Sequence, residues 1–111
     1  MDAQLKKYQG IFPAFYACYN EDGSVSAARV ERFAEYLLNK GVTGLYVGGS
    51  SGECIYQSVE ERKAILEAVM DAVGGKLVVI AHVACNNTRD SMELAAHAES
   101  AGADCIAAIP P

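Results

Sequence analysis

The sequence has little positive charge and no long apolar run, and each shortage excludes a class of protein. With 9 Lys+Arg against 14 Asp+Glu, the formal net charge is -5, so the chain lacks the basic surface that neutralises nucleic-acid phosphates. Its longest apolar runs, 77–81 and 105–111, fall far short of the roughly 20 residues that a membrane-spanning helix needs. Residues 1–7 also lack the apolar region of a secretory signal peptide. We therefore expect a cytoplasmic protein with neither a nucleic-acid nor a membrane partner.

Cysteine pairs at motif spacing are lacking as well. Cys18, Cys54, Cys85 and Cys105 are widely separated and form no Cys-x-x-Cys motif, so a disulfide scaffold is not indicated. The first three, with His82 beside Cys85, fall in or beside successive loops and are possible zinc ligands by residue type. Their spacing is poor, however, and cysteine is also an ordinary small buried residue. We predict reduced thiols and no metal site.

Four strand-like apolar runs recur along the chain at near-constant spacing. They cover 10–12, 44–47, 76–81 and 104–109. Continuous rather than alternating runs are typical of parallel strands covered on both faces. A spacing of about 30 residues fits strand–helix–strand crossovers. The runs therefore predict a parallel sheet.

The intervals between the runs carry helical signals. In the first interval the apolar residues follow the spacing of one helix face; they are Val30, Phe33, Ala34, Leu37 and Leu38. The second interval begins with a capping box formed by Ser58 and Glu61, and the third begins near Thr88. We expect the helices to end at glycines in the left-handed conformation. These glycines are Gly41, Gly74, Gly75 and Gly102.

This alternation of strands and helices predicts an α/β fold. With right-handed crossovers, it fits either an open doubly wound sheet or an arc of a (β/α)8 TIM barrel. The even spacing favours the barrel. A barrel needs roughly 250 residues, so 111 residues hold less than half of one. We predict a single partial domain over 1–111 that comprises the first four strands and three helices of a TIM barrel.

The most informative loop is Gly-Gly-Ser-Ser-Gly-Glu at 48–53, directly after the second predicted strand. Functional groups collect at this end of parallel strands, and the glycines allow successive N–H groups to point into one concavity that binds anions. Ser50 and Ser51 add hydroxyl donors. The loop has neither the lysine of a Walker A motif nor dinucleotide-binding spacing, which favours a small carboxylate. The alternative is a polar turn that binds nothing.

Residues 45–53, followed by 57–62, closely resemble the signature of the N-acetylneuraminate lyase and dihydrodipicolinate synthase family of Schiff-base aldolases. The resemblance extends over nearly the whole chain, including 41–44, 80–83 and 101–104. The Gly-Gly-Ser form of the loop and the Ala-His-Val ending of the third predicted strand are similar to the lyase branch. The synthase branch more often has Gly-Thr-Thr-Gly-Glu.

The resemblance implies a homotetrameric TIM barrel that reversibly cleaves N-acetylneuraminate to pyruvate and N-acetylmannosamine. It implies no cofactor, because a lysine forms a Schiff base with pyruvate and withdraws electrons from the bond being broken. The resemblance implies that Ser50 and Ser51 hold the pyruvate carboxylate. From the loop itself we add Gly49 as a substrate-binding residue and Gly48, Gly52 and Glu53 as loop supports. For Glu53 we expect a carboxylate that accepts backbone N–H bonds rather than an acid–base group.

No lysine follows a predicted strand at this rim. The lysines are Lys6, Lys7, Lys40, Lys63 and Lys76. We therefore expect no catalytic residue within the chain: the Schiff-base lysine and the proton-relaying tyrosines would lie beyond Pro111, and the chain alone would be inactive. The alternatives are a dihydrodipicolinate synthase-like pyruvate-condensing enzyme and a non-catalytic carboxylate-binding or structural half-barrel.

The remaining polar and aromatic candidates have simpler interpretations. We expect His82 to be a hydrogen-bonded residue at a strand end rather than a base, and His97 to be a surface residue or subunit contact. Tyrosines near a barrel rim usually serve packing; they are Tyr16, Tyr19, Tyr46 and Tyr56. An open arc leaves its outer strands unpaired, so we expect the isolated chain to self-associate.

Overall fold

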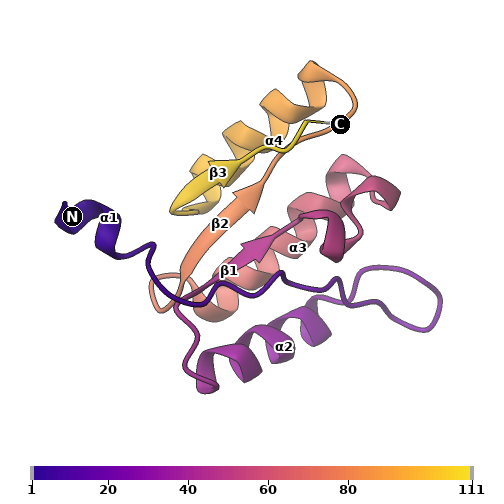
Figure 1. The fold of residues 1–111 in the computed structure, drawn as a ribbon. Helices are drawn as coiled ribbons and strands as arrows, with labels where there is room; N and C mark the ends of the chain where they lie inside the picture. Colours follow the sequence, from indigo (N-terminus) through magenta and orange to yellow (C-terminus); the bar gives the residue numbers. More distant parts are fainter. Residues whose placement is uncertain (1, 111) are drawn as a thin grey trace.

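A computed structural model describes residues 2–110 as a small parallel sheet covered by helices (Figure 1). The three strands lie in the order β1 (Gly44–Val47), β2 (Val78–His82) and β3 (Cys105–Ala107). The helices are α1 (Ala3–Lys6), α2 (Ala27–Asn39), α3 (Val59–Val73) and α4 (Thr88–Ala101). Both strand pairs are parallel, and Leu45 is in register with Val79. Met1 and Pro111, which the sequence-based predictions include, lie outside the described residues.

Helices α2, α3 and α4 cover one face of the sheet, with α3 packed between the other two (Figure 1). The core lies between these helices and the strands. Its least exposed side chains are Phe15, Val30, Ala34, Leu45, Val69, Val73, Val79 and Ala98. The opposite face of the sheet is only partly covered: Tyr46, Ile80 and Cys105 are half-buried. Burial on both faces, as the sequence predicted, is therefore achieved on one face alone within residues 2–110.

The first predicted strand, at 10–12, is not formed as a strand. The chain instead runs alongside β1, where the Tyr46 N–H donates to the Pro13 carbonyl and the Phe15 N–H donates to the Tyr46 carbonyl. Within 10–15, Ala14 alone pairs with β1, as an isolated bridge to Tyr46. Pro13 has no N–H and cannot continue a hydrogen-bonded ladder. The described sheet accordingly has three strands rather than four.

The other predicted elements form close to their expected positions. The Ser58–Glu61 capping box opens α3 with both reciprocal bonds present. Gly41 and Gly102 have φ of +83° and +93°, as expected for left-handed helix ends. At the end of α3 the left-handed residue is Gly75, at +78°, whereas Gly74 has φ -57°. Gly74 is instead required by space, because a Cβ there would lie 2.5 Å from the Met70 carbonyl oxygen.

The sheet formed by residues 2–110 is open, not a closed barrel. Its last strand is shorter than the predicted 104–109 run, and Ile106 and Ile109 are each 51% exposed. No helix in this part of the chain is long and apolar enough to cross a bilayer.

Candidate functional site

The glycine–serine loop leaves β1 at the edge where the carboxyl ends of the strands lie. Gly48 has φ +82°, a left-handed conformation that glycine adopts without a steric cost. The next residues form the one-turn helices η1 (Ser50–Gly52) and η2 (Cys54–Tyr56), separated by Glu53 in the left-handed conformation. The predicted motif is thus a compact, irregular turn that leads directly into α3.

The loop uses some of its N–H groups internally and leaves others unused. The N–H groups of residues 52–54 donate to the carbonyl oxygens of Gly49 and Ser50 at 2.9–3.3 Å. The N–H groups of Gly49, Ser50 and Ser51 donate to no acceptor within residues 2–110, and neither serine hydroxyl has a partner there. Both serines are exposed. Five adjacent donors are therefore unused: four on the exposed serines, which an anion can reach, and one on Gly49, which is buried.

Two of the loop glycines are required by space. A Cβ on Gly49 would lie 2.7 Å from the Tyr46 ring, and one on Gly52 would lie 2.8 Å from the Phe15 carbonyl oxygen. The loop therefore packs directly on β1 and on the segment that runs beside it. This close packing supports the predicted role of Gly52 in holding the loop.

Gln57, rather than the Glu53 carboxylate, supplies the side-chain support. Its Nε2 donates to the Gly52 carbonyl and to the Tyr19 hydroxyl, each at 2.9 Å. Among the described residues, the Glu53 carboxylate accepts no backbone N–H bond, contrary to our expectation, and the residue is exposed. Burial raises the pKa of the Tyr19 hydroxyl, which keeps it protonated.

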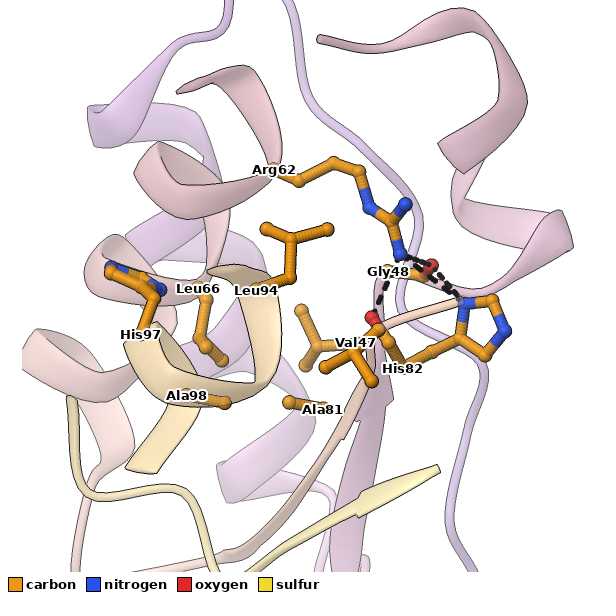
Figure 2. Close-up of a pocket in the computed structure, with 10 residues that line it drawn as sticks. Val47, Gly48, Arg62, Leu66, Ala81, His82, Leu94, His97 and Ala98 are labelled. Carbon is orange, nitrogen blue, oxygen red and sulfur yellow. Dashed lines mark hydrogen bonds between the residues drawn. The ribbon is translucent and has the colours of Figure 1, made fainter. Parts of the chain in front are cut away.

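Arg62 is a buried charged side chain at this edge to which sequence reasoning assigned no role. It is only 8% exposed and reaches from α3 to the carboxyl ends of the strands (Figure 2). Its Nη1 donates to the Ala84 carbonyl at 2.8 Å and lies 3.1 Å from the Cys85 Sγ. Its Nη2 donates to the carbonyl oxygens of His82, at 2.9 Å, and Gly48, at 3.4 Å.

His82 completes this network at the end of β2. Its Nδ1 lies 2.8 Å from the Gly48 carbonyl oxygen and its Nε2 lies 3.3 Å from the Ile109 nitrogen. Because a carbonyl only accepts and an N–H only donates, these two contacts place the proton on Nδ1. The longer approach of Arg62 Nη2 to Nδ1, at 3.4 Å, is then a contact between two donors rather than a hydrogen bond. Burial lowers the pKa of the imidazole, with a smaller contribution from Arg62, which favours this neutral form. His82 is thus a hydrogen-bonded strand-end residue, as predicted.

A cleft of about 430 Å³ opens beside the loop. Its polar lining includes Ser50, Gln57, Arg62, His82, Asn87 and Asp90. Gly49 and Ser51 lie outside it. A smaller cavity of about 20 Å³ lies beside Arg62 and is lined mainly by apolar side chains (Figure 2). None of the five lysines borders either space.

The other sequence candidates are not assembled into a site. Cys54 and Cys85 both border the cleft, but all four cysteines are unpaired. No group of three or more His, Cys, Asp or Glu within residues 2–110 is arranged to hold a metal ion. Tyr16 and Tyr56 are 61% and 79% exposed. His97 pairs with Glu67 at 2.7 Å, which joins α4 to α3.

Parallel strands, helices on one face and a polar loop at the strands' carboxyl edge define an α/β protein of the repeated βα type. The sequence model of the Dihydrodipicolinate synthetase family matches residues 7–111, and the chain belongs to this family. The resemblance drawn from the 45–53 motif is thereby confirmed.

Relatives and solved structures extend this similarity. The N-acetylneuraminate lyase of Mediterraneibacter gnavus is 64% identical over 107 residues, which are 96% of this chain and 34% of that protein. A Ruminococcus gnavus sialic acid aldolase with a mutated catalytic lysine superposes with a TM-score of 0.95 at 64% identity, covering 96% of this chain and 35% of that one. An Escherichia coli K12 prophage protein of the dihydrodipicolinic acid synthase family, in complex with pyruvate, gives 0.87 at 35% identity, with 92% and 34% covered. The chain spans about a third of the length of these relatives and matches their N-terminal part.

Proposed function

We propose that this chain is the N-terminal part of a class I aldolase-type lyase that reversibly cleaves N-acetylneuraminate to pyruvate and N-acetylmannosamine. The observation that carries the proposal is the group of five unused donors on Gly49, Ser50 and Ser51. The 64% identity to an N-acetylneuraminate lyase supports the choice of substrate. A pyruvate complex of a relative at 35% identity supports the keto acid itself.

The loop suits a carboxylate for a physical reason. A carboxylate has two oxygens that accept several hydrogen bonds, and bonds to a charged acceptor are roughly twice as strong as neutral ones. We assign the carboxylate of pyruvate to the Gly49 N–H and to the N–H and hydroxyl groups of Ser50 and Ser51. Gly48, Gly52 and Gln57 hold this turn in shape.

None of the chain's five lysines borders the cleft beside the loop, and two of them are poorly suited to form the Schiff base, because an amine must lose its proton before it attacks a carbonyl. Lys63 lies 2.6 Å from the Glu93 carboxylate, and this hydrogen bond raises its pKa. Lys7 is paired with Asp104 in the same way, and its pKa is raised. We propose that the Schiff-base lysine and the proton-relaying tyrosine belong to the rest of the complete protein.

The arrangement of the helices supports the barrel. A doubly wound sheet carries helices on both faces, whereas α2, α3 and α4 cover a single face here. We propose that residues 1–111 form one partial TIM-barrel domain and that the complete protein is a homotetramer.

The experiment is a pyruvate titration of the 15N-labelled chain followed by the amide signals of Gly49, Ser50 and Ser51. Saturable shifts at these amides are expected, and Ser50→Ala combined with Ser51→Ala weakens binding at least tenfold if two hydrogen bonds of about 1 kcal/mol each are lost. Ser100→Ala, on the exposed side of α4, is the matched control. Equal affinity of the double variant and the control would refute the assignment.

A further inference from the structure

We infer that His82 and Arg62 are positioning residues for the carboxylate loop: they hold the Gly48–Gly49 peptide so that its N–H stays available to the ligand. The identity of that ligand rests on the proposed function, whereas the geometry of the peptide does not. Neither side chain needs to touch the ligand in this role.

The planarity of the peptide bond carries the argument. A trans peptide is rigid, and its C=O and N–H groups point in opposite directions. The Gly48 carbonyl oxygen accepts from the His82 Nδ1–H at 2.8 Å and from Arg62 Nη2 at 3.4 Å. Two donors on one side of the peptide therefore direct the Gly49 N–H to the other side, where it donates to no acceptor among residues 2–110.

The orientation of the Gly48–Gly49 peptide is weakly restrained by its own residues, so it depends on the His82 and Arg62 donors, which we call the clamp. The peptide lies between two glycines, which lack the Cβ atoms that restrict rotation in other residues. Without external donors, the peptide plane can rotate. The Gly48 carbonyl oxygen would then point to the side where the Gly49 N–H had pointed, and it would repel a carboxylate there. A single conformation of the loop thus depends on groups outside it.

The clamp itself is built into the ends of all three strands. His82 ends β2, and its Nε2 accepts the Ile109 N–H that follows β3. Arg62 is fixed by the Ala84 carbonyl oxygen, at 2.8 Å, and by the His82 carbonyl oxygen, at 2.9 Å (Figure 2 shows the bond to His82). The position of the loop after β1 is therefore tied to the loops after β2 and β3.

Two substitutions of His82 separate positioning from general support of the fold. His82→Asn places an amide nitrogen near the former Nδ1, so it keeps a donor for Gly48 but loses the Ile109 contact. His82→Gln reaches the former Nε2 position, so it keeps an acceptor for Ile109 but loses the donor to Gly48. Arg62→Lys keeps the charge but presents a point donor instead of a planar fork.

The experiment is hydrogen–deuterium exchange, read by mass spectrometry, on the full 111-residue chain with and without sodium pyruvate. Peptides covering 48–54 report the amides of residues 52–54, which are hydrogen-bonded within the loop. We expect His82→Asn to match the wild type, and His82→Gln to exchange about tenfold faster and bind pyruvate about tenfold more weakly, as for one lost hydrogen bond of about 1.4 kcal/mol. The matched control is Arg89→Gln, because Arg89 is exposed on α4 and borders neither the cleft nor the smaller cavity.

The outcomes separate this inference from the proposed function. Equal exchange and equal pyruvate affinity in His82→Asn and His82→Gln would overturn the positioning role. Faster exchange in His82→Gln, with no effect of pyruvate on the wild type, would support positioning and overturn the proposed ligand. If His82→Gln does not fold, Arg62→Lys decides: faster exchange in 48–54 supports the inference, and unchanged exchange overturns it.

Discussion

Replacing Arg62 with methionine tests how much the network at the strand ends contributes to stability. The substitution keeps an unbranched apolar stem in a site where the arginine is 8% exposed, and it removes every guanidinium contact. Two of those contacts are short bonds to carbonyl oxygens, at 2.8 Å to Ala84 and 2.9 Å to His82. The contacts at 3.1 Å to Cys85 Sγ and 3.4 Å to the Gly48 oxygen are weaker.

The magnitude follows from the two short bonds. Hydrogen bonds from a charged donor contribute about 1.5 to 3 kcal/mol each when one partner is removed and a buried acceptor is stranded. The carbonyl of His82 loses its arginine donor, whereas Gly48 keeps the His82 Nδ1–H. We therefore expect Arg62→Met to lower the free energy of unfolding by about 3 kcal/mol, a large part of the 5–15 kcal/mol typical of a domain.

The assay is urea denaturation followed by circular dichroism, analysed by linear extrapolation. Arg89→Met is the control, because Arg89 is exposed on α4; such surface changes shift stability by no more than about 0.5 kcal/mol. A midpoint for Arg62→Met that coincides with that of Arg89→Met, at an unchanged m-value, would refute the reasoning.

Three further predictions follow from the same geometry. Burial lowers the pKa of His82 below its value in the unfolded chain, so the unfolded state binds the proton first and stability falls as the pH drops below about 6.5; urea midpoints between pH 7 and 5 should show this slope in the wild type and lose most of it in His82→Asn. Borohydride added with pyruvate should leave the chain's mass unchanged, since none of the five lysines borders the cleft and Lys7 and Lys63 are paired with carboxylates; a covalent adduct would show that a lysine of this chain is the nucleophile. Light scattering should detect association of the isolated chain, because the edge strand β3 carries Ile106 at 51% exposure; a stable monomer at high concentration would contradict the open-sheet account.

The features that the sequence predicted well depend on neighbouring residues. The capping box at Ser58 and Glu61 and the strand at 44–47 are encoded within a few positions. The prediction of a strand at 10–12 was wrong because it was based on the apolar residues and ignored Pro13, which has no N–H to donate to a hydrogen-bonded ladder. The local sequence pattern thus predicted the position of the loop correctly but predicted one strand too many for the sheet of residues 2–110.

The site residues that escaped prediction depend on contacts distant in sequence. Arg62 bonds to carbonyl oxygens 14 to 22 residues away, and no local pattern encodes such partners. One signal was present: Arg62 occupies the same face of α3 as the buried Ile65, Leu66 and Val69, and a charge on a buried face must be paired. The loop is supported by Gln57 and not, as predicted, by Glu53. The Gln57 amide donates to the Tyr19 hydroxyl and to the Gly52 carbonyl, and a contact with such a distant residue cannot be read from the local sequence.

The most direct test of the carboxylate loop is a crystal structure of the chain grown with pyruvate. We predict that the two carboxylate oxygens lie within about 3.2 Å of the Gly49, Ser50 and Ser51 nitrogens and of the Ser50 and Ser51 hydroxyls. Pyruvate bound elsewhere on the chain, with these five donors facing only solvent, would contradict the account.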